Sequence, residues 1–321
     1  MAVSSTSLPL DTPEFVFRTK QRGLWGQAWQ RLLRNKLAVV AGAVLTTILV
    51  LSILTATVPA IESHPPHEQQ YTVVQSGPTA DFPLGTDNLG RDLWARVWEG
   101  MRISLKIGLG TQTLVLIFGL AVGAGAALGG RFTDNLLMRF TDLMFAFPDL
   151  LAIIIMRAVL TERDWPLIGS GDPQIPGFPG ALVQVILAIA FVGWVTLARL
   201  VRGQMLSLRE TDYVRAAESM GASRRRIVFS HMLPNTLGPV IVAITFGIPL
   251  AIFAEAVLGF IGFSLPPPTA SLGTLVSDGY VYYRVNAWMI AVPSVAIAAL
   301  MLCFTFLGDG LRDALDPRTR K

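Results

Sequence analysis

The residues that most often perform catalysis or bind metals are few in this sequence and lie far apart. His64, His67 and His231 are its three histidines, and their spacing matches neither HExxH nor another metal-binding motif. His64 and His67 are close enough to share a metal, although two loop histidines are more often simply solvated. Cys303 is the single cysteine and lies in an apolar run, so the sequence contains no disulfide framework and no thiolate cluster. A bound metal ion is not expected.

Nucleotide binding through a phosphate loop is excluded by a missing dipeptide. The motif GxxxxGK[ST] needs a glycine followed directly by a lysine, and the sequence contains no Gly-Lys pair. If ATP drives this protein, another chain must bind it.

The most distinctive polar stretch is residues 213–235, YVRAAESMGASRRRIVFSHMLPN, which separates two long apolar runs. Asp212 is predicted to cap a short helix over residues 213–220. Gly221 can adopt the left-handed conformation that ends such a helix.

A second helix is expected to follow, capped by Ser223 and ended by Pro234, because proline cannot continue a helix. The result is a helix-glycine-helix elbow. Ala216 and Ala217 carry almost no side-chain bulk, so this elbow could enter a groove on another protein. Alternatively, the arginines of the stretch only hold it on the cytoplasmic side of a membrane. Their spacing alone does not decide between the two interpretations.

Composition places the chain in a membrane. Hydrophobic residues make up 52% and charged residues 15%, and the mean hydropathy is +0.53, which is too apolar for an ordinary soluble domain. The net charge of +4 could suggest nucleic acid, but the basic residues are distributed by membrane side and do not gather on one face. We therefore expect contact with membrane lipid and not with nucleic acid.

Six apolar segments approach or exceed the length that a helix needs to cross roughly 30 Å of hydrocarbon. They cover residues 37–61, 107–130, 143–160, 181–198, 237–263 and 287–307. The chain is thus predicted to be an all-α membrane protein with a six-helix domain over residues 37–311. An external loop is expected at residues 62–100 and a cytoplasmic loop at residues 202–236.

A tail is expected on each side of this domain. Residues 15–36 place Trp25, Trp29 and Leu33 on one face at helical spacing, with Arg31 opposite. This pattern predicts an amphipathic helix that lies on the membrane within the cytoplasmic tail of residues 1–36. A helix that binds a partner protein is the alternative. Residues 312–321 form the second cytoplasmic tail.

The basic residues predict the orientation of the chain in the membrane. With the N-terminus in the cytoplasm, six spans also place the C-terminus there, and most lysines and arginines then lie on the cytoplasmic side. Of the 26 lysines and arginines, the opposite side keeps only Arg91, Arg96, Arg102, Lys106, Arg157, Arg163 and Arg284. The arginine-rich elbow is therefore expected to face the cytoplasm.

Two acidic residues fall within or beside the apolar segments. Glu255 lies in the fifth segment, where a carboxylate is costly unless it faces water, a partner or the bundle interior. It either lines a pathway or joins helices through hydrogen bonds. Phe147-Pro148 is expected to kink the third segment near Asp149, which could line a path or sit at the cytoplasmic boundary.

Glycines in the second segment predict close helix packing. They recur as overlapping small-xxx-small pairs, which allow another helix to approach. The residues are Gly119, Gly123, Gly125 and Gly129.

Several motifs resemble those of ABC importer permeases. Residues 216–235, with AA, G and LPN at the family's spacing, resemble the loop through which such permeases receive force from an ATPase. Three further motifs resemble the C-type permeases of the oligopeptide, dipeptide and nickel importers. They are GTDNLGRD at residues 85–92 followed by RISL at 102–105, ARLVRGQMLSL at 198–208, and FLGDGLRDALDPR at 306–318. The likeness extends from about residue 25 to the C-terminus.

This resemblance implies a type I ABC importer permease in a prokaryotic plasma membrane. Peptides would be its substrates, and its partners would be a B-type permease, one or two ABC ATPases and an extracytoplasmic binding protein. ATP and Mg²⁺ would bind to the ATPase, which leaves this subunit without a cofactor or catalytic activity. The residues implied in ATPase coupling are Tyr213, Arg215, Ala216, Ala217, Glu218, Gly221, Arg226 and Pro234.

The chain departs from the family pattern at two positions. Many relatives carry Glu where this chain has Arg215, and many carry Trp where it has Leu272. An ion pair between that Glu and an ATPase therefore cannot be transferred to this chain. Arg215 could instead pair with Glu218, which lies one turn further along the same helix.

Other functions remain open at this point. Nickel or oligosaccharide transport occurs within the same group of permeases. A self-sufficient secondary transporter would show inverted repeats or several intramembrane acids, of which Glu255 is the one strong example. An intramembrane enzyme would need a nucleophile and base, or metal ligands, within the spans. No histidine lies within any of the predicted spans.

Overall fold

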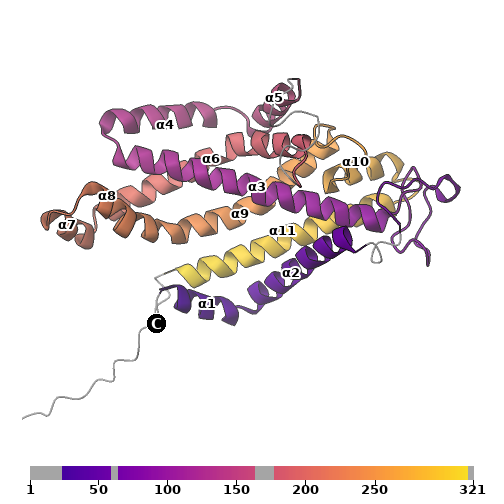
Figure 1. Ribbon diagram of the computed structural model, residues 1–321, viewed down its shortest axis with the longest axis horizontal. Coiled ribbons are helices and arrows are strands. Elements are labelled where there is room, and N and C mark those ends of the chain that lie inside the picture. Colours follow the sequence, from indigo (N-terminus) through magenta and orange to yellow (C-terminus); the bar gives the residue numbers. More distant parts are fainter. Residues whose placement is uncertain (1–23, 59–63, 163–176, 317–321) are drawn as a thin grey trace, which may run out of the picture.

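The computed structural model describes residues 24–58, 64–162 and 177–316. Within these ranges the chain forms helices joined by turns and loops, with an isolated β-bridge between Thr86 and Asp92. Figure 1 shows the long helices running roughly side by side along the longest axis of the molecule. The prediction of an all-α protein is confirmed for these residues.

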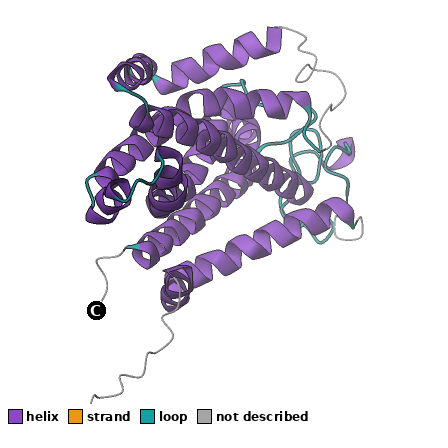
Figure 2. Cartoon of the chain, turned by 60° about the vertical axis from the view of Figure 1, so that its left-hand side comes forward, coloured by secondary structure: helices purple, strands orange, loops and turns teal. Residues whose placement is uncertain are grey.

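Helices make up most of the described chain. In chain order they are α1 (Leu24–Arg34), α2 (Lys36–Thr57), the 3₁₀ turn η1 (Tyr71–Val73), α3 (Leu93–Leu128), α4 (Arg131–Phe145), α5 (Asp149–Glu162), α6 (Gly180–Arg209), α7 (Asp212–Ser219), α8 (Arg224–Ile227), the π-helical turn η2 (Val228–Met232), α9 (Leu233–Phe260), α10 (Leu272–Tyr282) and α11 (Trp288–Leu315). Figure 2 shows the same bundle turned by 60°, with its longer loops gathered at one end.

Five helical stretches of the described chain are long and apolar enough to cross a membrane. They are α2, α3, α6, the continuous stretch Arg225–Phe260 and α11. The bent pair α4 and α5 supplies a sixth span if its two helices are counted as one. The predicted number of six spans is therefore reached when α4 and α5 are counted together as one span.

The boundaries of the predicted third span are wrong. Residues 143–160 do not form one kinked helix, because α4 ends at Phe145, α5 begins at Asp149, and the two helices meet at 92°. Pro148 lies directly before α5, where its ring prevents the α4 helix from continuing through the break. The bend expected at Phe147-Pro148 is therefore present, as a break between two helices and not as a kink within one helix.

The helix of the second span begins well before its apolar segment of residues 107–130. Helix α3 starts at Leu93, one residue after Asp92, whose side-chain Oδ1 accepts a hydrogen bond from the Trp94 amide at 2.9 Å. Asp92 is therefore the N-cap of the helix. In the preceding loop, Gly85 and Gly90 have φ of +78° and +72°, the left-handed region that favours glycine.

Helices α3 and α6 pack against each other, and glycines of α3 allow α6 to approach closely. A Cβ placed on Gly119 would lie 2.8 Å from the Leu197 Cβ, and one on Gly123 would lie 2.5 Å from the Ala198 carbonyl oxygen. Gly125 instead has ordinary contact with α4, 3.6 Å from Leu137. The predicted packing role thus brings α6 close at the first two positions, and at Gly129 it brings α4 close, where a Cβ would lie 2.6 Å from the Thr133 Cβ.

The two ends of the described chain lie side by side. Helix α1 packs against the end of α11, and Arg31 donates a hydrogen bond to the Asp316 carbonyl at 3.3 Å. Trp29 and Leu33 on α1 remain exposed, as expected of a helix that lies on a membrane surface. In Figure 1, α1 and α7 occupy the left half of the view, and the loop of residues 64–92 lies at the right-hand end.

Candidate functional site

The elbow predicted between the fourth and fifth long spans is present, but its first helix begins differently. Helix α7 includes Asp212 as its first residue, and Thr211 is the N-cap, without a side-chain capping bond. Asp212 is therefore not the cap. It lies in the first helical turn, where a carboxylate still stabilises the helix through the dipole.

Gly221 and Ser223 confirm the predicted turn between the two helices. Gly221 has φ of +79°, the left-handed region that favours glycine, and the Ala222 amide donates to the Ala217 carbonyl at 3.0 Å. Ser223 Oγ then accepts a hydrogen bond from the Arg226 amide at 3.4 Å. The next helix begins directly after this serine.

Pro234 does not end the second helix, contrary to the prediction. Helix α8 passes without interruption into η2 and then into α9, so that Pro234 lies at the start of a long helix. The Leu233 amide donates to the Val228 carbonyl, five residues back, as in a π-helix. This wider turn ends just before Pro234, and its altered hydrogen-bond pattern lets the helix continue past the proline.

One face of the elbow is anchored to the chain's own core. Val214 is fully buried and Ala217 is 6% exposed. Both belong to a cluster of buried residues that includes Met205 of α6 and Ile227 of α8. Ala217 therefore faces inward, which corrects the expectation that both small side chains lie at an open tip; Ala216 is the exposed member of the pair.

The opposite face of the elbow is open. The exposed residues on α7 and the following turn are Asp212, Tyr213, Arg215, Ala216, Glu218, Ser219, Met220 and Gly221, and Arg226 and Phe229 are exposed beyond the turn. Arg215 pairs with Glu210 at 2.5 Å, at the end of α6, and not with Glu218. Glu218 and Arg226 are both exposed on this face.

An unanticipated contact joins the start of the elbow to the start of α9. Asn235 Nδ2 donates to the His231 carbonyl at 2.6 Å and to the Tyr213 hydroxyl at 3.4 Å. The Tyr213 and His231 rings lie 6.5 Å apart. These contacts link α7 and η2 to the start of the long helix α9.

Glu255 is fully buried and joins three parts of the chain. One carboxylate oxygen accepts from Ser104 Oγ of α3 at 3.0 Å, and the other accepts from Ser264 Oγ, in the loop after α9, at 2.9 Å. Of the two interpretations from sequence, joining helices through hydrogen bonds is the one that this geometry supports within the subunit. Asp149, the second candidate, is exposed at the first residue of α5.

The two loop histidines each face a carboxylate. His64 Nδ1 lies 3.9 Å from Asp92 Oδ2, and His67 Nε2 lies 3.4 Å from Glu99 Oε1. Burial, together with the charge of Arg91, lowers the pKa of His67. These contacts hold the loop of residues 64–92 against the first turns of α3.

A buried ionic network lies at the end of the molecule opposite the elbow. Asp87 accepts hydrogen bonds from Arg91 Nε at 2.6 Å and from Arg96 at 2.7 Å. Asp278 of α10 lies 3.6 Å from Arg96 and 3.9 Å from Arg91. Sequence reasoning identified this loop only through a motif, because nothing in the spacing of residues 87–96 indicates a partner at residue 278.

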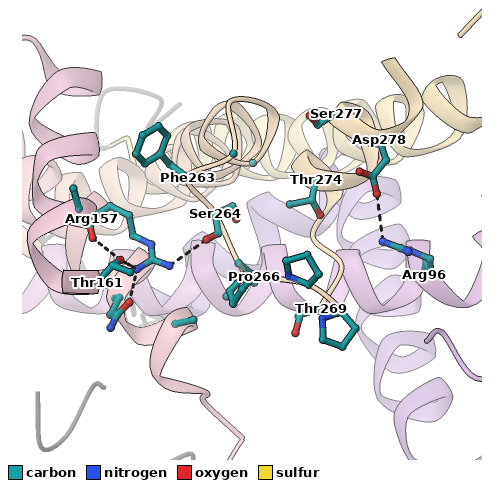
Figure 3. Close-up of a pocket in the computed structure, with 18 of the residues that line it drawn as sticks. Arg96, Arg157, Thr161, Phe263, Ser264, Pro266, Thr269, Thr274, Ser277 and Asp278 are labelled. Atoms are coloured by element: carbon teal, nitrogen blue, oxygen red, sulfur yellow. Dashed lines mark hydrogen bonds and ion pairs between the residues drawn. The ribbon is translucent and has the colours of Figure 1, made fainter. Parts of the chain in front are cut away.

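The same end of the molecule contains a cavity of about 810 Å³. Its wall includes Arg96 and Asp278 on one side and Arg157 of α5 on another, with the loop of residues 263–269 between them (Figure 3). Pro266 and Phe263 give this loop an apolar surface. The cavity therefore combines an apolar wall with buried cationic groups.

Together these features define the class of protein. The chain is a multi-pass membrane permease whose fold is that of an ABC importer. It is similar to a chain of the inward-facing MetNI methionine ABC transporter, with a TM-score of 0.55, 18% identity, and coverage of 70% of this chain and 97% of that one.

Family models then identify it further. One described as "Binding-protein-dependent transport system inner membrane component" matches residues 116–321, and one described as "N-terminal TM domain of oligopeptide transport permease C" matches residues 23–78. This chain belongs to the binding-protein-dependent permease family of the inner membrane.

Two relatives show how much of the chain this likeness covers. The oligopeptide transport system permease protein OppC of Bacillus subtilis is 36% identical over 302 residues, or 94% of this chain and 92% of the relative. The dipeptide transport system permease protein DppC of the same organism is 36% identical over 295 residues, or 92% of this chain and 86% of the relative.

Proposed function

We propose that this chain is the C-type half of the translocation pathway of an ATP-driven peptide importer. A B-type permease would form the other half, and an extracytoplasmic binding protein would deliver oligopeptides or dipeptides. One or two ABC ATPases would hydrolyse ATP with Mg²⁺, and this subunit would bind neither. The proposal is supported by the similarity to oligopeptide and dipeptide permeases over more than nine tenths of the chain.

The geometry of the elbow is the observation that carries the coupling mechanism. Its buried face joins α6, α8 and the start of α9 in one cluster, and its other face is free for a partner. Closure of an ATPase dimer against that free face would displace the elbow as a rigid unit. The attached long helices would move with it and alternate the access of the pathway between the two membrane sides.

Purification of the tagged chain with its assembled partners tests this function. Gentle extraction from the native membrane, followed by mass spectrometry, should recover a second permease and one or two ATPases that contain phosphate loops. The assembly, reconstituted in liposomes with the binding protein, should import peptides only when ATP is present. Recovery of this chain alone, still transporting without ATP, would favour a self-sufficient secondary transporter instead.

A further inference from the structure

Arg157 is a buried cation whose partners in the described chain are all neutral. Its side chain is 5% exposed. The guanidinium donates to the hydroxyl of Thr161, to the amide oxygen of Gln184 and, at 3.1 Å, to the carbonyl of Ser264 (Figure 3). Its Nε has no hydrogen-bond partner. Among the described residues, no carboxylate forms an ion pair with it.

The other two buried arginines of the same cavity differ from Arg157. Arg91 and Arg96 both bond to the Asp87 carboxylate, and Asp278 lies close to both. Glu162 also lines the cavity, but its side chain is exposed and does not pair with Arg157. The carboxylates that form ion pairs beside this cavity therefore lie close to Arg91 and Arg96.

A buried guanidinium without an anion is costly, because the charge has lost its hydration and gained no opposite charge in return. Here it lies in the wall of a cavity of about 810 Å³, which is within the usual range for small-molecule sites. Its planar donor fork suits a carboxylate better than a spherical anion. The apolar surface of Phe263 and the prolines at residues 266–268 would contact the uncharged part of such a ligand.

We propose that Arg157 binds the C-terminal carboxylate of a transported peptide in this cavity. The inference rests on the proposed function, which supplies the peptide as the ligand. The cavity lies at the end of the molecule opposite the elbow, where a peptide delivered from outside would enter. Arg157 would thereby favour peptides with a free carboxyl end over those in which that end is neutral.

The test compares uptake of tetra-alanine with uptake of its C-terminal amide by the complete transporter in liposomes. Arg157→Gln removes the charge and keeps hydrogen-bonding groups, and Arg284→Gln removes an exposed charge outside the cavity as the control. Because every transporter receives peptide from the same binding protein, that protein's preference cancels when variant and wild-type ratios are compared. We expect the acid-to-amide uptake ratio to fall about tenfold in Arg157→Gln, the size of effect typical of one charge-assisted contact. Arg284→Gln should leave it unchanged.

Other outcomes would overturn the proposal. An unchanged ratio in an assembled Arg157→Gln transporter would exclude the carboxylate contact while leaving peptide import intact. An equal loss for both peptides, with loss of a co-purifying subunit, would show that Arg157 pairs with an acidic side chain of that subunit. If wild-type transporter imports neither peptide, the proposed function fails and this inference fails with it.

A second measurement needs no variant. Equilibrium dialysis of the wild-type complex in nanodiscs, without binding protein, should show tetra-alanine binding about tenfold more tightly than its amide. Equal binding of the two peptides would overturn the proposal even if Arg157→Gln fails to assemble.

Discussion

At the scale of single residues, the elbow depends on the backbone conformation of Gly221. Its φ of +79° disfavours any residue that has a Cβ, although no neighbouring atom lies within 4 Å of the place where that Cβ would be. Backbone conformation, and not lack of space, is therefore what requires glycine here.

Replacement of Gly221 should uncouple ATP hydrolysis from transport. Gly221→Ala should cost about 1–2 kcal/mol locally, and Gly221→Pro should abolish ATP-driven uptake because its φ cannot be positive. The measurement is peptide uptake per ATP hydrolysed in liposomes. Gly203→Ala is the matched control, because a Cβ there also meets nothing within 4 Å and the residue is helical. Normal uptake by Gly221→Pro would contradict the elbow mechanism.

The buried carboxylate of Glu255 is a second site where one side chain holds several parts of the chain together. Glu255→Ala should lower the melting temperature of the purified complex strongly, because two serine hydroxyls lose their acceptor in the core, at about 1–3 kcal/mol for each unsatisfied group. Glu255→Gln retains one acceptor and should have a smaller effect. Asp149→Asn, at an exposed position, serves as the control. Equal melting temperatures for Glu255→Ala and wild type would refute this structural role.

At the scale of elements, the elbow has two faces with different tasks. The inward face packs Val214 and Ala217 into the core, and the outward face exposes Ala216. A bulky probe therefore tests docking only when it is placed on the outward face.

The pair Ala216→Trp and Ala217→Trp separates docking from folding. Ala216→Trp should leave the thermal stability of the subunit unchanged and reduce co-purification of the ATPase. Ala217→Trp should destabilise the elbow itself, because overpacking a core typically costs about 1–3 kcal/mol. Full ATPase recovery with Ala216→Trp would argue against the outward face as the docking surface.

The contact between α3 and α6 is the other element-scale feature that single residues control. Gly123→Ala should lower the melting temperature in detergent, because the added Cβ would lie 2.5 Å from a backbone oxygen of α6 and force the helices apart. Gly125→Ala on the same helix places its Cβ at an ordinary 3.6 Å and is the matched control. Equal stability of the two variants would contradict the tight packing at Gly123.

At the scale of the whole molecule, the elbow and the cavity of Arg157 lie at opposite ends of the bundle. Helices α6 and α9 connect the two ends, since both begin or end at the elbow and both contribute residues to the cavity wall. Movement of the elbow would therefore also move parts of that wall.

This arrangement requires one orientation in the membrane, which remains a prediction from the distribution of lysine and arginine. Reporter fusions at the N-terminus and the C-terminus should both report the cytoplasm. A cysteine introduced at Tyr283, which is exposed beyond α10, should react with an impermeant thiol reagent applied from outside. Labelling of that cysteine only after the membrane is broken would reverse the assignment.

The sequence alone determined the properties that depend on local chemistry and periodicity. Apolar runs of sufficient length identify the spans, and Gly221 and Ser223 identify the turn of the elbow, because a positive φ and an N-cap are decided by neighbouring residues. The family could also be recognised, because its motifs are contiguous in the chain. Local rules failed at Pro234, where a π-helical turn lets the helix continue.

Only the tertiary structure decided which side chains meet. It turned Ala217 inward and Ala216 outward, and it bent the third span by 92°. It also joined Glu255 to Ser104 and Ser264, which lie 151 and nine residues away in the sequence. It also left Arg157 among neutral partners in the wall of a cavity. Burial and pairing are sums over groups brought together from distant parts of the chain, so no local pattern of residues contains them.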